Sequence, residues 1–281
     1  MPGALEGDRE SGASSAGGRP WLIHEVGALL AIAQRDLVKL LRDRIRLGVS
    51  LAFPILLIAG LGGSLQALVG RATGLDVVAL TFTGVLAATL FQSSAAGMMS
   101  LIEDRENDFS RELFVAPVSR IAIVSGKVLG ESLVALTQGV GVVAFALLLG
   151  IRMSPGQLGA LLPAAVGCCL LGGAFGLATL AALPNQRAAL QVFPFVILPQ
   201  YFLAGVVAPL RGLPGYLDLV SWAMPLRYPV DLTRAAFYSG RPAYGQVVTE
   251  SPLLDAAVMA VLFVVLVILG GLLLEHRERN R

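Results

Sequence analysis

The sequence carries little charge: Asp, Glu, Lys and Arg make up 14% of its 281 residues, whereas hydrophobic residues make up 56%. Soluble domains usually contain about 25% charged residues. A mean hydropathy of +0.75 agrees with this imbalance. The composition therefore predicts an integral membrane protein rather than a soluble domain. The formal net charge of +2 is too small to indicate a nucleic-acid partner.

Histidine and cysteine are also scarce, with two of each. His24 and His276 lie outside the charge-free runs described below, and neither CxxC nor HExxH occurs. No histidine metal site or Ser/His dyad is therefore expected within the membrane, which argues against an intramembrane enzyme. Cys168 and Cys169 are adjacent in an apolar run, and adjacent cysteines seldom bridge each other. We expect both to be small core residues.

A phosphate-binding loop is missing as well. The motif GxxxxGK[ST] does not occur, and the nearest match is Gly126-Lys127-Val128, with Ile121 where the first glycine would stand. Because the chain cannot hold ATP phosphates in this way, we expect no ATPase activity and no cofactor of its own.

The chain does contain six runs without Asp, Glu, Lys or Arg. Each offers roughly the 20 apolar residues that a helix needs to cross a membrane, so the sequence predicts an all-α membrane protein with six spans. The fourth run is longer and contains three prolines, so its span should lie inside the limits of the run. The runs are Leu47–Gly70, Val77–Ile102, Ser132–Ile151, Met153–Gln186, Ala188–Leu210 and Ala256–Leu274.

The distribution of basic residues predicts the orientation. With both termini in the cytoplasm, fifteen of the 21 Lys and Arg residues fall on the inner side. This is the positive-inside arrangement, although the long loop before the last span weakens it. We expect a multi-pass protein of the cell membrane with a short cytoplasmic tail, 275–281.

The segment before the first span has two parts. Residues 1–20 are rich in Gly, Ser and Ala, lack the apolar region of a signal peptide, and are expected to form a disordered cytoplasmic tail. In 21–46, leucines and other apolar residues recur at helical spacing, and basic residues occupy the other face. This pattern predicts an amphipathic helix at the cytoplasmic interface. A soluble helix packed against another element is the alternative.

The fifth run contains Pro194 and Pro199, which predict a broken or re-entrant helix because proline lacks a backbone N–H. After it, residues 213–238 are only moderately apolar, and they read as short outer helices rather than a seventh span. The aromatic residues of this segment suit a membrane interface. They are Tyr216, Trp222, Tyr228 and Tyr238.

Ionisable residues are scarce within the six runs. Carriers driven by protons or sodium usually keep such residues near the middle of the membrane, so this scarcity argues against a secondary carrier or channel. Polar glutamines could line a transport path, or they could form hydrogen bonds between helices. The candidates for the path are Gln92, Gln138, Gln191 and Gln200, and Gln66 belongs to the same group.

The segment 103–120, EDRENDFSRELFVAPVSR, is a dense charge cluster between the second and third spans. It begins with mixed charge, becomes amphipathic, and reaches Pro117, where a helix is expected to end. A short charged helix in this place could transmit force from a soluble partner, or the segment could be a solvated connector. The residues alone leave both open.

The sequence ELFVAPVSR, with the acidic and basic residues before it, resembles the cytoplasmic segment of ABC-2-type permeases, the membrane subunits of ATP-driven exporters. It is most similar to the daunorubicin-resistance-like branch of multidrug and lipid exporters. Asp108 departs from the pattern, since the family usually has glycine there, so the local turn should differ. The residues that this resemblance assigns to ATPase coupling are Glu103, Arg105, Glu106, Phe109, Arg111, Glu112, Leu113, Phe114, Pro117 and Arg120.

A second match lies downstream, where FLAGVVAPLRGLP (202–214) and WAMPLRYPVDLTRA (222–235) resemble the outer segment of the same family. The order of elements agrees over 21–281, and the resemblance makes 47–274 the transmembrane domain. It implies an outer gate or re-entrant region at 205–240. The residues assigned to this gate are Pro194, Pro199, Gly205, Pro209, Pro225, Tyr228 and Asp231.

The resemblance further implies a half-transporter. Two permeases would pair as a homodimer through their first and fifth spans, and two copies of a separate ATPase would bind ATP and magnesium. An amphiphilic drug, lipid or glycolipid-like substrate would leave toward the outer face of a bacterial cell membrane. A secondary carrier or channel is the alternative function.

Overall fold

The computed structural model describes residues 44–70, 74–100, 120–210 and 214–279, together with Gln34, Val38, Arg42 and Ala72. Every regular element within these residues is a helix, which confirms the predicted all-α class. The elements are α2 (Arg44–Leu56), η1 (Leu57–Gly62), α3 (Gly63–Leu65), η2 (Gln66–Gly70), α5 (Val77–Gly97), α8 (Arg120–Leu148), α9 (Pro155–Ala181), α10 (Gln186–Leu203), α11 (Gly215–Trp222), α12 (Arg227–Tyr238), α13 (Tyr244–Val247) and α14 (Pro252–Arg279).

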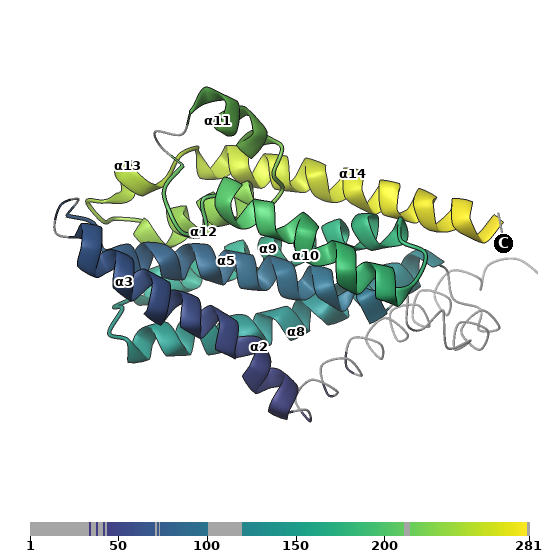
Figure 1. Ribbon diagram of the computed structural model, residues 1–281, viewed down its shortest axis with the longest axis horizontal. Helices are drawn as coiled ribbons and strands as arrows, with labels where there is room; N and C mark the ends of the chain where they lie inside the picture. Colours follow the sequence, from purple (N-terminus) through teal and green to yellow (C-terminus); the bar gives the residue numbers. More distant parts are fainter. Residues whose placement is uncertain are drawn as a thin grey trace, which may run out of the picture.

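Within the described ranges, five helices are long and apolar enough to cross a membrane. They correspond to the first, second, third, fourth and sixth predicted spans, and they run roughly along the long axis of the molecule (Figure 1). The helix in the fifth run, α10, is not one of the five, so the count of six spans stays a prediction. The five helices cover Gly48–Gly70, Val77–Gly97, Ser125–Leu148, Pro155–Ala181 and Pro252–His276.

Two of the long helices continue past the charged residues that bounded the predicted spans. α8 begins at Arg120, well before Ser132, and therefore contains Lys127 and Glu131. The two side chains form an ion pair of 3.2 Å one helical turn apart, and this pairing makes their burial possible. Asp255 likewise lies within the first turn of α14, directly before the predicted sixth span. Where the membrane begins along these two helices stays a prediction.

Several helices begin at residues whose side chains cap the free backbone N–H groups. Oδ1 of Asp76 accepts a hydrogen bond from the N–H of Ala79 at the start of α5. Ser154 and Gln157 form a reciprocal capping box at the start of α9, and Asn185 caps α10. Such caps contribute about 1 kcal/mol each. They fix where the short loops between the long helices end.

The central helix of the bundle is α5, which packs against α9, α8 and α12. Its contact with α9 depends on glycines, because a Cβ atom at Gly172 would collide with the carbonyl oxygen of Phe91 and one at Gly176 with that of Ala95. Small residues of this kind let helix backbones approach closely within a membrane. Beside this contact, Cys168 is buried and unbridged, as is its neighbour Cys169, which confirms the prediction of core residues.

The prolines of the fifth run do not interrupt its helix. α10 continues through Pro194 and Pro199 and ends at Leu203, followed by Gly205 with a φ of 76°. Both prolines are exposed on the helix surface. The change of direction therefore occurs at the glycine, whose lack of a Cβ permits the left-handed conformation, and not at the prolines.

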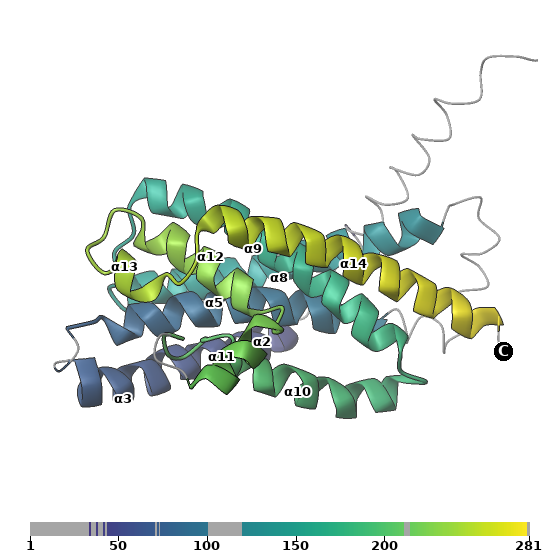
Figure 2. The ribbon, with the colours of Figure 1, turned by 90° about the horizontal axis from the view of Figure 1, so that it is seen from above.

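The short helices predicted between 213 and 238 are present as α11 and α12. α12 packs against α5, α9 and α14, and it lies inside the helical layer in both views (Figures 1 and 2). Tyr228 and Tyr238 are buried within the protein, whereas Tyr216 and Trp222 are exposed, and the place of these rings relative to the membrane interface stays a prediction. The aromatic signal did not distinguish a buried ring from an interfacial one, because both need an apolar body and a polar tip.

Candidate functional site

Most of the predicted coupling segment lies outside the described residues. This applies to Glu103, Arg105, Glu106, Phe109, Arg111, Glu112, Leu113, Phe114 and Pro117. The remaining residue, Arg120, is the first residue of α8. The predicted helix end at Pro117 and the roles of the segment stay predictions.

The residues on either side of this segment are joined by buried polar groups. The Lys127–Glu131 pair is only 4% and 7% exposed. Oγ of Ser100 donates a hydrogen bond of 3.4 Å to Oε1 of Glu131, which connects the residues just after α5 to α8. Gly97 leaves the space that the Glu131 side chain occupies, since an added Cβ would overlap its carboxylate. Segment 101–119 therefore joins two parts of the chain, Ser100 and α8, that are hydrogen-bonded to each other.

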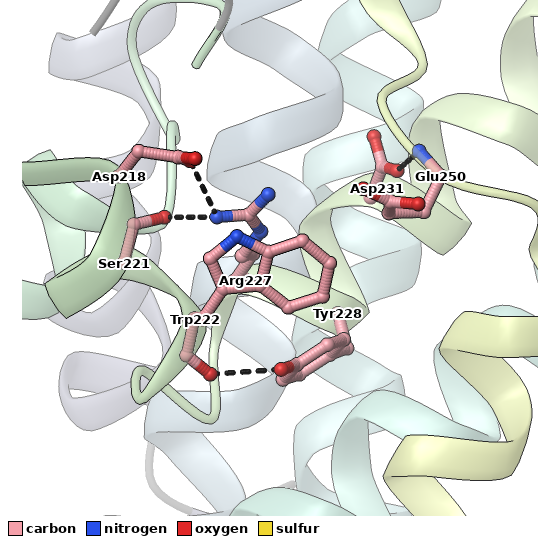
Figure 3. A network of polar contacts seen from close by, with 7 residues as sticks. All are labelled: Asp218, Ser221, Trp222, Arg227, Tyr228, Asp231 and Glu250. Carbon is pink, nitrogen blue, oxygen red and sulfur yellow. Dashed lines mark hydrogen bonds and ion pairs between the residues drawn. The ribbon is translucent and has the colours of Figure 1, made fainter. Parts of the chain in front are cut away.

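A second polar cluster surrounds α12 (Figure 3). Nη1 of Arg227 donates to Oγ of Ser221 at 2.7 Å and lies 3.2 Å from Oδ1 of Asp218, both on α11. Its guanidinium also lies 4.3 Å from the centre of the Trp222 ring. The hydroxyl of Tyr228 donates to the carbonyl oxygen of Trp222 at 2.8 Å. These contacts fix α11 on top of α12.

One turn further along α12, Asp231 holds the chain that leads into α14. The carboxylate of Asp231 accepts hydrogen bonds from the backbone N–H groups of Thr249 and Glu250 at 2.7–3.0 Å (Figure 3). Asp255, which is 1% exposed, faces Asp231 and Glu250. Its Oδ2 has no hydrogen-bond partner among the described residues. Charge-assisted bonds to backbone N–H groups are stronger than neutral ones, so Asp231 is a firm attachment point between α12 and α14.

The third charged residue of α12 connects it to the end of α10. Arg234 is 1% exposed, and its Nη2 donates to the carbonyl oxygen of Gly205. Burial lowers the pKa of Arg234 to about 10, which leaves the guanidinium charged at neutral pH. Oε1 of Gln200, on α10, accepts a hydrogen bond of 3.3 Å from the N–H of Leu226. Two polar contacts thus hold the turn after α10 against α12.

The residues predicted for the outer gate separate into two groups. Gly205, Tyr228 and Asp231 are buried in the network around α12, whereas Pro194 and Pro199 are exposed on α10. Two further prolines, at positions 209 and 225, are half-buried in the connections that flank α11. The structure therefore brings the glycine, tyrosine and aspartate of the set together and leaves the α10 prolines apart from them.

The four path candidates do not share one surface. Oε1 of Gln92 accepts a hydrogen bond of 2.8 Å from the hydroxyl of Tyr201, which connects α5 to α10. Gln200 is buried in the α12 network, Gln138 is buried in α8, and Gln191 is exposed on α10. At Gln92 and Gln200, the helix-to-helix hydrogen bond is the interpretation that the geometry supports.

Sequence reasoning missed Arg227 and Arg234, although a signal was present. Arg227, Asp231 and Arg234 are spaced four and three residues apart, which places them on one face of a helix. Charges so spaced beside apolar residues indicate a strongly amphipathic helix. The tertiary structure covers the charged face with α11, the α10 turn and the chain before α14, so all three side chains are buried.

The chain resembles several known proteins in sequence. The family model described as ABC-2 type transporter matches residues 27–238. A putative transport permease ycf38 of Cyanophora paradoxa is 27% identical over 73% of this chain and 72% of its own length. Nodulation protein J of Rhizobium meliloti is 27% identical, covering 66% of this chain and 71% of its own. The probable multidrug ABC transporter permease YbhR of Escherichia coli K12 is 27% identical over 50% of this chain and 38% of its own.

Proposed function

Because the chain belongs to the ABC-2 type transporter family, we propose that it is the permease subunit of an ATP-driven exporter. A separate ATPase would bind ATP and magnesium, and the permease would move an amphiphilic drug, lipid or glycolipid-like molecule outward across a bacterial cell membrane. The family match over 27–238 carries this proposal. The name of the multidrug relative supports the substrate class, as does the apolar character of the helices.

We place the ATPase contact at 103–120. This segment connects two apolar helices, α5 and α8, and Ser100, just after α5, is hydrogen-bonded to Glu131 of α8. A push on the segment would therefore move both helices as one unit. Phe109, Leu113 and Phe114 would fill an apolar cleft of the ATPase, and the charged residues around them would set its orientation. Burial of one such apolar side chain contributes about 1.5–3 kcal/mol.

We propose that two copies pair through the faces of the first apolar helix and α10. These elements are neighbours in the chain's own fold, since the rings of Phe53 and Tyr201 lie 6.2 Å apart. Figure 2 shows α3 and α10 along one edge of the molecule. Large apolar side chains are exposed there, including Phe195 (78%) and Phe202 (70%). Contiguous apolar surface of this kind suits contact with lipid or with a second copy.

A secondary carrier is the competing function, and the buried ionisable residues are its only support. Glu131 directly precedes the charge-free part of α8, which begins at Ser132. Asp255 is the fourth residue of its helix. Both therefore lie near the ends of the apolar helices rather than near the centre, where carriers usually keep their coupling residues.

The test is co-expression of the full chain with the ATPase encoded beside it, identified by a GxxxxGK[ST] loop. We expect the two proteins to co-purify, the permease alone to show no ATP hydrolysis, and the active complex to have the mass of two copies of each. Phe114→Ala should weaken the association, whereas Glu106→Ala should leave assembly intact and lower the hydrolysis stimulated by amphiphilic substrate. Leu148→Ala is the matched control, since Leu148 is exposed at the other end of α8.

Two results would contradict parts of the proposal. If both variants bind the ATPase and transport as well as the parent and the Leu148→Ala control, segment 103–120 is only a connector. If the active complex contains one copy of this chain, the permease does not act as a homodimer.

A further inference from the structure

An apolar groove of about 700 Å³ lies between α9, α12 and α14 and is partly open to the outside of the bundle. This volume falls in the range of small-molecule sites, roughly 300–1,000 Å³. Its walls are almost entirely aliphatic, and Ser239 is the polar side chain among them. The residues that line it include Ala160, Ser239, Pro252, Ala256, Ala260 and Val264.

The groove occupies one end of the long helices. Its α14 wall extends from Pro252 to Val264, which is about 18 Å at 1.5 Å per residue. Its α9 wall begins at Ala160, near the start of that helix. A length of 18 Å is slightly more than half of the roughly 30 Å hydrocarbon core of a bilayer. The groove therefore follows one leaflet of the membrane.

The length and lining of the groove suit a hydrocarbon chain. Its apolar wall runs along about 18 Å of α14. Carbon atoms in van der Waals contact lie about 3.5–4.0 Å apart, so an alkyl chain can lie against this wall along its length.

Two arginines lie at the end of the groove that faces the membrane surface. Arg241 donates from Nη2 to Oε1 of Gln157 at 3.2 Å and to the carbonyl oxygen of Arg152. Nε2 of Gln157 donates to the carbonyl oxygen of Ser239, which lines the groove. The backbone of Arg152 and the side chain of Arg241 are thus connected to the groove wall through Gln157.

These arginines are available to an anion. Arg152 is exposed and Arg241 half-exposed, and within the described ranges neither is paired with a carboxylate. The guanidinium of Arg241 lies 4.1 Å from the centre of the Phe237 ring, which holds it in place without neutralising its charge. Arginine in such a position suits bidentate contact with a phosphate group.

We propose that the groove binds a phospholipid of the surrounding bilayer whose headgroup has a net negative charge. One acyl chain lies along α14 between Pro252 and Val264, and the phosphate contacts Arg152 and Arg241. Lipid tails are as apolar as the groove, so the chain gains packing but little hydrophobic free energy on entering it. Selectivity for this lipid therefore comes from the two arginines.

The experiment measures the lipid that the full-length protein retains. The protein is reconstituted into nanodiscs of phosphatidylglycerol and phosphatidylcholine in equal parts and re-extracted in mild detergent, and the retained lipid is then quantified by mass spectrometry. Ala260→Phe and Ala256→Phe fill the groove, and Ala257→Phe is the matched control, because Ala257 is exposed on α14 but does not line the groove. The double change Arg152→Gln/Arg241→Gln removes the headgroup contacts, with Arg187→Gln as its control.

We expect the parent and both controls to retain phosphatidylglycerol at least about threefold over phosphatidylcholine. Filling the groove should lower total retained lipid, and the double arginine change should remove the preference while some lipid remains. Equal retention by Ala260→Phe and Ala257→Phe, in monodisperse protein, would overturn the proposal. A change of oligomeric mass in Ala260→Phe with unchanged lipid would overturn it too, by making the groove a contact between copies. Loss of ATPase binding or transport has no bearing on this readout.

Discussion

Arg234, buried in the middle of α12, donates a hydrogen bond to the carbonyl oxygen of Gly205, 29 residues earlier in the chain. Gly205 is the residue with a φ of 76° that ends the course of α10. One buried guanidinium therefore holds the turn that redirects the chain away from the fifth helix. The nearest charge that favours this guanidinium is Asp231, one turn earlier on α12.

Arg234→Ala should destabilise the protein. It removes a charged hydrogen bond and leaves the carbonyl group of Gly205 buried without this donor, a change that costs about 1.5–3 kcal/mol. We expect a lower midpoint of thermal unfolding in detergent, measured by the loss of the monodisperse species after heating. Arg187→Ala, at an exposed position, should leave the midpoint unchanged, and an equal effect of both changes would contradict the buried role.

Alanine substitution of three glycines should produce a graded loss of stability. Gly205 has a positive φ, and an added Cβ there would lie 2.8 Å from the side chain of Leu210. Gly240 has a positive φ of 74° but open space around it, and Gly215 has open space without a positive φ. The left-handed conformation costs an L-residue roughly 1–2 kcal/mol. The expected order of destabilisation is therefore Gly205→Ala, then Gly240→Ala, then Gly215→Ala, and a larger effect at Gly215 would contradict it.

The Lys127–Glu131 pair should behave as a coupled unit. Glu131→Gln leaves the buried ammonium group of Lys127 without its carboxylate, and breaking a buried pair in this way costs about 3–5 kcal/mol. Replacing both residues, as in Lys127→Met/Glu131→Leu, should recover much of that loss. The measurement is a double-mutant cycle of thermal stability and membrane level. Strictly additive effects of the two single changes would show that the pair does not couple.

The predicted orientation can be tested by cysteine labelling in intact cells. Cysteines introduced at Ser14 and Asn280 should resist an impermeant thiol reagent. A cysteine at Ser239, which is exposed at the end of α12, should react. Labelling of the native cysteines should be low, because Cys168 and Cys169 are buried. Labelling at Asn280 would contradict the cytoplasmic location of the C-terminus.

Glu106→Ala and Phe114→Ala should separate two roles of the segment between α5 and α8. Loss of the apolar side chain should lower ATPase association, since its burial contributes about 1.5–3 kcal/mol. Loss of the exposed charge should change association little, because such ion pairs contribute about 0–1 kcal/mol. Pull-down of the ATPase measures the first effect, and substrate-stimulated ATP hydrolysis measures the second. Equal weakening of the pull-down by both would contradict the division.

The sequence by itself determined the helical membrane class, because long apolar runs in a chain with 14% charge leave few other ways to satisfy the backbone. It also located four of the long helices closely, because the ends of their charge-free runs lie within five residues of the helix ends. The family resemblance rested on short motifs and was confirmed. Charge did not mark where the helices themselves begin, because α8 continues through the paired side chains of Lys127 and Glu131.

Only the tertiary structure decided what α12 does. Its charged residues read as an exposed outer segment, yet Arg227, Asp231 and Arg234 are buried because three other parts of the chain supply their partners. Those partners are Ser221, the backbone of Thr249 and Glu250, and the carbonyl group of Gly205. They come from positions up to 29 residues away, and neither periodicity nor composition reports contacts at such separations. The groove between α9, α12 and α14 likewise exists only once these helices are packed together.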